Sequence, residues 1–148
     1  VLTVVRMKGV FWSLVALISL CCLAAHAEGL NKEKFSRGAW EHDIGYVQAV
    51  RVGNTLYISG SVGQGAMPEA IGQAFGAIKE TLEHYHLDFS NVVKETVYTT
   101  DLDALKTHAV VRRPFYGEDF PAATWVQVSR LYDLAHVIEV EVIAVFPE

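Results

Sequence analysis

The chain has 148 residues, of which 51% are hydrophobic, and its 12 basic and 17 acidic side chains give a net charge of −5. This length suits one domain with an apolar core and is too short for two domains of ordinary size. Nucleic-acid binding needs a cationic surface, so the acidic balance disfavours a ribonuclease role.

The first 27 residues have the three parts of a secretory signal peptide. A short basic region with Arg6 and Lys8 precedes an apolar run over residues 9–24, and Ala25-His26-Ala27 is a small-x-small cleavage site. We expect cleavage after Ala27 and export to the periplasm or beyond, whether translation starts at residue 1 or 7. We expect no membrane association after cleavage.

Cleavage has chemical consequences for the mature chain. It removes both cysteines, Cys21 and Cys22, and with them any disulfide, thiol nucleophile or cysteine metal site. It leaves 10 basic and 17 acidic side chains, a net charge of −7. Two alternatives stay open: a retained membrane anchor, for which the apolar run is short, and a lipoprotein, for which Leu20 is too bulky a neighbour of the cysteines.

The mature chain divides into a leader and a domain. Residues 28–41 are polar, mixed in charge and without a period, which predicts a flexible leader, and residues 42–148 form the domain. We predict a β-hairpin from three neighbouring patterns. Residues 47–52 alternate between apolar and polar, a Gly-Asn turn follows, and residues 56–59 form a second extended run. The glycine-rich stretch 60–65 has neither a phosphate-loop lysine nor dinucleotide spacing and predicts a flexible loop.

Helices and strands alternate in the rest of the chain. Apolar residues spaced by three and four predict a helix over residues 68–86. A β-branched run predicts a strand over 92–100. A second helix is expected over 102–113, stopping before Pro114 or shortly after it, and strands are expected over 124–131 and 137–146. The order ββαβαββ indicates an α+β fold with one sheet and two helices on one face.

The final strand is apolar except for Glu139 and Glu141, which predicts burial on both faces. The chain offers no further element to cover the open face of the sheet, so we expect copies of the chain to pack against one another there. The two glutamates are two residues apart, so both point to the same side. Each either pairs with an arginine such as Arg51 or Arg130, or lies in a ligand site with a raised pKa.

Other candidate residues are ambiguous. Tyr46 begins the first strand, where its ring either lines a cleft or packs. Arg112 and Arg113 end the second helix, where a solvated role at the helix dipole competes with substrate binding. The histidines are scattered without ligand spacing, so we expect no metal site, and no motif indicates a cofactor.

The carboxy-terminal part of the chain resembles the signature of the RidA (YjgF-type) family. The matching segments, which keep the family's order over about residues 42–146, are 45–48, 56–60, 93–98, 101–102, 120–131 and 138–145. The resemblance implies a chorismate-mutase-like fold and a homotrimer with small-molecule pockets between subunits. The family's enzymes hydrolyse enamines and imines to 2-keto acids and ammonia.

The resemblance also implies roles for individual residues. The pocket tyrosine of the family matches Tyr46, the glutamate that positions the attacking water matches Glu139, and Ser59 and Gly60 line the pocket with backbone. The arginine that holds the substrate carboxylate has no counterpart, because Ala123 stands in its place, and a pocket asparagine falls on Ala109. The chain therefore looks like a divergent member of the family.

Loss of this arginine removes both orientation and charge-assisted hydrogen bonds for a carboxylate. Arg112 or Arg113 could replace it from the helix, and Trp125 could hold an apolar or aromatic ligand. Three functions stay open: a deaminase or related hydrolase with a non-standard substrate, a non-catalytic exported trimer that binds a small ligand, and a scaffold for another protein.

Overall fold

The computed structural model describes residues 29–148, and the predicted signal peptide over residues 1–27 lies outside this range. The elements in chain order are β1 (Glu33–Phe35), α2 (Ala39–Ile44), β2 (Ala49–Val52), β3 (Thr55–Gln64), α3 (Met67–His84), η1 (Phe89–Asn91), β4 (Val92–Thr99), α4 (Leu102–His108), η2 (Ala109–Arg112), α5 (Arg113–Tyr116), β5 (Ala122–Gln127) and β6 (His136–Val145). From β2 onward this is the predicted ββαβαββ order. Among the described residues, no helix has the length and apolar character needed to cross a bilayer.

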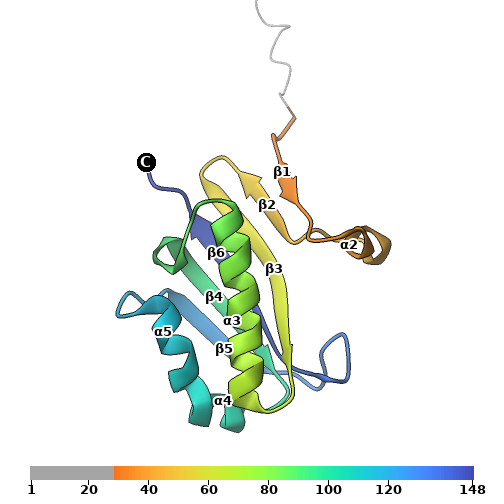
Figure 1. Cartoon of the computed structure of the whole chain (residues 1–148), viewed down its shortest axis with the longest axis vertical. Helices are drawn as coiled ribbons and strands as arrows, with labels where there is room; N and C mark the ends of the chain where they lie inside the picture. Colours follow the sequence, from red (N-terminus) through yellow and green to blue (C-terminus); the bar gives the residue numbers. More distant parts are fainter. Residues whose placement is uncertain (1–28) are drawn as a thin grey trace, which may run out of the picture. The chain divides into compact units, whose positions relative to one another are not determined.

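The strands form one six-stranded sheet in the order β1-β2-β3-β6-β4-β5. The last strand of the chain, β6, lies in the middle of the sheet and is antiparallel to both β3 and β4, whereas β5 is an edge strand parallel to β4. Helix α3 crosses one face of the sheet, with α4 and α5 beside it (Figure 1). The predicted α+β fold, with helices on one face, is confirmed.

The core lies between α3 and the sheet. Every second residue of β6, from Ile138 to Ala144, is buried, and these residues belong to one cluster with the apolar stripe of α3 that includes Phe75. Burial of each large apolar side chain contributes about 1.5–3 kcal/mol. The same alternation places Glu139 and Glu141 on the opposite, open face of the sheet.

The amino-terminal segment differs from the flexible leader predicted over residues 28–41. Strand β1 pairs with β2 at the sheet edge, and the ring of Phe35 stacks on His84 with centroids 3.8 Å apart. Helix α2 ends at Gly45, whose φ of 101° is a left-handed cap that glycine adopts without strain. Pairing of the backbone at a sheet edge leaves no apolar period in a sequence, which is why the prediction missed β1.

The prediction of a flexible loop over Gly60–Gly65 is wrong, because residues 60–64 continue strand β3. These glycines let neighbouring atoms come close to the strand; they do not make it flexible. A Cβ at Gly63 would overlap the backbone of Ala70 in α3, so the helix packs directly on the strand at this point. On the other face of the sheet, Gly60 allows the side chain of Glu139 to come equally close.

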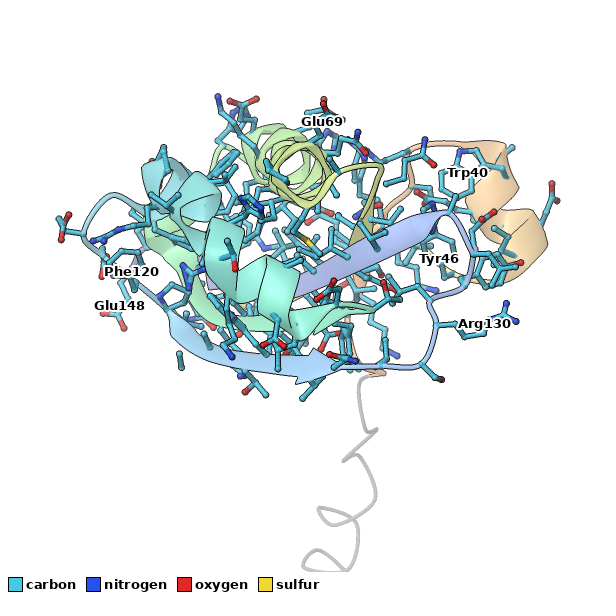
Figure 2. The ribbon with its side chains drawn as sticks, turned by 90° about the horizontal axis from the view of Figure 1, so that it is seen from below. Trp40, Tyr46, Glu69, Phe120, Arg130 and Glu148 are labelled. Carbon is cyan, nitrogen blue, oxygen red and sulfur yellow. The ribbon has the colours of Figure 1, made fainter. Side chains whose placement is uncertain are left out.

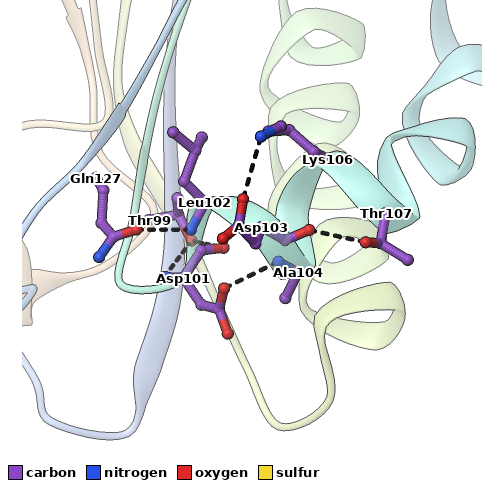
Figure 3. Close-up of polar contacts among 8 residues, drawn as sticks. All are labelled: Thr99, Asp101, Leu102, Asp103, Ala104, Lys106, Thr107 and Gln127. Carbon is purple, nitrogen blue, oxygen red and sulfur yellow. Dashed lines mark hydrogen bonds and ion pairs between the residues drawn. The ribbon is translucent and has the colours of Figure 1, made fainter.

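The second helical region is docked by its amino terminus (Figure 3). Asp101 caps α4 by accepting a hydrogen bond from the N–H of Ala104 at 2.9 Å, and Gln127 of β5 accepts one from Leu102 at 3.1 Å. Pro114 falls in the first turn of α5, where proline is tolerated, so helical structure continues to Tyr116. This arrangement holds the start of α4 against the end of β5.

Candidate functional site

The candidate residues form two separate groups within one copy of the chain. Tyr46, Ser59, Gly60 and Glu139 lie on β3, β6 and the segment after α2, whereas Arg112 and Trp125 lie on η2 and β5. Strand β5 is at the opposite edge of the sheet from β1 and β2. Figure 2 shows Tyr46 and Phe120 on opposite sides of the domain. We call these the Glu139 group and the Arg112 group.

Glu139 is placed by a bulge in the neighbouring strand. It pairs with Val62 of β3, and the register between β3 and β6 shifts between Ile58 and Ser61. The side chain of Glu139 lies over Gly60, where an added Cβ would overlap its carboxyl group. A glycine at residue 60 is therefore what allows the carboxyl group to occupy this position.

The environment of Glu139 favours its protonated form. Burial raises the pKa of the carboxyl group, the negative charge of Glu141 raises it further, and His136 lowers it. The net direction is upward, toward the range in which a carboxyl group exchanges protons near neutral pH. His136 also lies at this end of β6, and its Nδ1 is buried without a partner among the described residues.

Glu141, on the same face, has a different environment. It is exposed, and it accepts a hydrogen bond from the hydroxyl of Tyr98 at 3.3 Å. The alternative of arginine pairing is not observed in the described part of the chain: Arg51 pairs with Glu33 at 3.7 Å, and Arg130 donates to backbone carbonyls. The two glutamates share a face but differ in burial and partners.

Tyr46, a member of the Glu139 group, packs against α2. Its ring meets that of Trp40 edge to face with centroids 5.8 Å apart. Burial raises the pKa of the Tyr46 hydroxyl, and the charges of Glu41 and Glu139 raise it further, which keeps the phenol protonated. The hydroxyl of Ser59 is not available to a ligand, because it donates a hydrogen bond to the backbone carbonyl of Val47 at 2.7 Å. Its contribution to a pocket would come from the backbone.

Glu41 is a buried carboxylate that the sequence analysis missed. It is fully buried, one oxygen accepts a hydrogen bond from the N–H of Gln48 at 3.0 Å, and the other oxygen has no partner among the described residues. The missed signal is Gly45, a helix stop after residues 39–44. Assigning these residues to a leader hid the carboxylate.

The Arg112 group is organised around Glu95, which the sequence analysis also missed. Glu95 is fully buried on β4. Its carboxylate accepts hydrogen bonds from the hydroxyl of Tyr116 at 2.8 Å and from Nε1 of Trp125 at 2.9 Å. Arg112 completes the set with an ion pair of 3.3 Å. Burial is the largest cause that raises the pKa of Tyr116, followed by the charge of Glu95, so this phenol remains a hydrogen-bond donor.

Arg112 is buried instead of solvated, contrary to the interpretation that it acts at an exposed helix end. Its side chain is 10% exposed, and its guanidinium lies 4.9 Å from the Trp125 ring and 5.3 Å and 5.6 Å from those of Tyr116 and Phe120. Arg113 is exposed and pairs with Glu118 at 3.7 Å. Only the first of the two arginines is built into the protein interior.

A hollow of about 440 Å³ lies over this group. Its lining is mainly apolar and aromatic and consists of Ala109, Val110, Arg112, Arg113, Phe120 and Trp125. Ala123 is exposed on β5 and pairs with Glu95 of β4, so it lies at the same edge of the sheet. Within residues 29–148 no group of three His, Cys, Asp or Glu side chains could hold a metal ion.

Comparison with known proteins finds matches over most of the domain. Residues 39–146 match the family model described as endoribonuclease L-PSP. The 2-iminobutanoate/2-iminopropanoate deaminase of Bos taurus is 38% identical over 109 residues, covering 68% of this chain and 79% of that protein. The deaminase of the same name from Homo sapiens is 34% identical over the same shares.

Solved structures give the same result. A Mycobacterium tuberculosis member of the YjgF/YER057c/UK114 family superposes with a TM-score of 0.72 at 25% identity, covering 78% of this chain and 99% of that one. Yeast Mmf1 superposes with a TM-score of 0.67 at 26% identity, covering 80% of this chain and 97% of that one. The match thus extends over nearly all of these relatives.

Proposed function

Because the chain belongs to the RidA (YjgF-type) family, we propose that it hydrolyses the C=N bond of a small imine, or of its enamine tautomer, and releases ammonia. Relatives with an imine deaminase activity in their names are 38% and 34% identical to it over 109 aligned residues. The observation that carries the proposal is Glu139, a half-buried carboxyl group with a raised pKa seated against Gly60.

The proposed chemistry is the addition of water followed by loss of ammonia. Protonated Glu139 gives its proton to the imine nitrogen as a water oxygen bonds to the imine carbon, and it takes a proton back from that water. Transfer of the remaining hydroxyl proton to nitrogen then breaks the C–N bond and leaves a carbonyl group and ammonia. Tyr46, kept protonated by its surroundings, donates a hydrogen bond that orients the substrate.

We propose a homotrimer in which the pocket lies between subunits. In a closed ring each protomer presents one surface to the next, so the Glu139 group of one copy can meet the Arg112 group of another. The open face of the sheet supports association, because it carries a hollow of about 270 Å³ bordered by apolar Val50 and Ile143 together with Tyr57. Analytical ultracentrifugation tests the trimer directly.

The substrate is proposed to be non-standard, because Ala123 leaves the pocket without the arginine that holds a carboxylate. Residues 1–27 are proposed to direct export, which mass spectrometry of the protein recovered from outside the cytoplasm would test. A mature chain beginning at residue 28 is the expected result. The acidic net charge gives no support to RNA cleavage.

The decisive experiment is ammonia release from freshly generated imines of several amino acids and amines. Glu139→Gln should lower the rate by about 10²–10⁴-fold, the usual contribution of a general acid–base group. Glu141→Gln is the matched control, since it removes a carboxylate from the same face of the same strand and should leave the rate within a few-fold. Equal losses in both variants would contradict the assignment of Glu139.

A second candidate function is non-catalytic binding of a small ligand. The burial of Arg112 against Glu95 favours it, because this arginine, a candidate to replace the one missing at residue 123, is already paired. Absence of ammonia release from every imine, together with measurable binding of small aromatic compounds, would support binding over hydrolysis.

A further inference from the structure

We infer that the hollow between η2 and β5 binds a neutral planar group, and that Glu95 sets this preference by compensating the charge of Arg112. This inference rests on the proposed function, because it names the ligand class that the Arg112 side of the pocket accepts. It makes Glu95 a specificity-determining residue that acts through Arg112.

The first step is the charge of the site. Arg112 is 8% exposed and Glu95 is fully buried, and their side chains form an ion pair at 3.3 Å. Tyr116 and Trp125 each donate to one oxygen of the Glu95 carboxylate, so the carboxylate is held on both sides. A carboxylate ligand would bring a second negative charge to a cation that Glu95 already neutralises, so the pair offers it no net attraction.

The second step is the shape and chemistry of the walls. Trp125 and Phe120 line the hollow and face the guanidinium, and Ala109 and Val110 add small apolar surface. Aromatic rings and a planar guanidinium stack well against another planar group. A volume of about 440 Å³ accommodates one ring system of modest size.

The third step is an unused donor on Arg112, one of the residues that line the hollow. Nε of Arg112 is buried and has no hydrogen-bond partner among the described residues. A buried donor without an acceptor is costly, and a neutral carbonyl or amide oxygen would satisfy it without adding charge. Planarity, neutrality and one acceptor oxygen together describe an aromatic amide or ketone, and exclude an aromatic acid.

Benzamide and benzoate are the probes, because they share a ring and differ in charge. Binding to the full chain is measured by NMR titration of the indole N–H signal of Trp125, assigned by its loss in Trp125→Phe. Benzamide should bind at least about tenfold more tightly than benzoate. Tighter binding of benzoate, equal binding of the two, or no binding of either, would overturn the inference.

Glu95→Gln keeps an acceptor oxygen but removes the compensating charge, so benzoate affinity should rise about tenfold relative to benzamide. Glu118→Gln is the matched control: it frees Arg113, which also lines the hollow but is exposed, and should change the ratio less than about twofold. An unchanged ratio in a folded Glu95→Gln protein would overturn the role of Glu95.

Ala123→Arg keeps the test open if Glu95→Gln does not fold, because residue 123 is exposed and the buried pair is untouched. An added cation at this edge should raise benzoate affinity about tenfold. No rise would mean that the ligand does not bind in this hollow, and would overturn the inference. The NMR titration measures ligand binding and does not depend on catalytic activity. Benzamide preference without ammonia release would therefore sustain this inference while the proposed hydrolysis fails, and ammonia release without the preference would do the reverse.

Discussion

Gly60 of β3 lies directly beneath the carboxyl group of Glu139 in β6, so closely that any side chain at residue 60 would overlap that carboxyl group. The contact crosses the bulge at which the register between the two strands shifts. The position of the proposed acid–base group is thus set by the absence of a side chain on the neighbouring strand.

Gly60→Ala should therefore separate activity from stability. The added methyl group overlaps the Glu139 side chain from Cγ outward and its nearest contacts include no backbone atom, so a change of rotamer can relieve the overlap at a cost of about 1–3 kcal/mol. Ammonia release should fall at least about tenfold, because the carboxyl group loses its place. Urea unfolding and the ammonia assay, run on the same preparation, check both parts. A fully active Gly60→Ala protein would count against Glu139 as the reacting group.

Glu139→Gln should stabilise the protein at neutral pH. Burial raises the pKa of Glu139 in the folded state above its unfolded value of about 4.3, so ionisation of this group opposes folding. Below the unfolded-state pKa both states hold the proton and the variant gains nothing. As pH rises through the folded-state pKa the gain appears, and it stays below about 1 kcal/mol because the group is half-exposed. Urea unfolding at pH 4 and pH 7 measures this gain in stability. An equal gain at both pH values would show that ionisation of Glu139 is not its cause.

Two glycine substitutions should act in opposite directions. Gly63→Ala places a methyl group against the backbone of Ala70, which cannot move without shifting α3, and should cost about 1–3 kcal/mol or more. Gly72 lies in α3 with open space around its Cβ position, so Gly72→Ala should stabilise by about 0.5–1 kcal/mol. Thermal unfolding of both variants tests the two predictions. Destabilisation by Gly72→Ala would mean that the Cβ position at residue 72 is not open.

Tyr116→Phe should destabilise the protein by about 1–3 kcal/mol, because one oxygen of the buried Glu95 carboxylate loses its donor. The ring and its packing against Phe75 are kept, so the loss reports the hydroxyl alone. Tyr132→Phe is the control, since Tyr132 is exposed and its hydroxyl should contribute nothing measurable. Urea unfolding compares the two, and equal effects would contradict the role of the Tyr116 hydroxyl.

Glu41→Gln should lower the pKa of Tyr46 by more than Glu139→Gln does. The charges of both glutamates raise the pKa of this phenol, and Glu41 has the larger effect of the two. Gln at residue 41 keeps an acceptor for the N–H of Gln48, so α2 should stay in place. NMR titration of a ¹³C-labelled tyrosine signal, assigned by Tyr46→Phe, measures both shifts. The reverse order would mean that Tyr46 lies closer to Glu139 than to Glu41.

The amino-acid sequence by itself determined the order of the elements from β2 onward and the faces of α3 and β6. Apolar residues spaced by three and four fixed α3, and the period of two placed Glu139 and Glu141 on one face of β6. Both are local patterns, since the geometry of a helix or a strand decides which neighbouring residues share a side. The resemblance of the motifs then indicated the family.

Only the tertiary structure decided which distant segments meet. Strand β6 lies between β3 and β4 instead of beside β5, and the glycines at 60 and 63 belong to a strand because of what packs against them. Arg112 is buried because Glu95, seventeen residues earlier, lies beneath it with Tyr116 and Trp125. A charged residue can be buried only with its partner in place, and the partner is brought there by packing between elements, which no local period records.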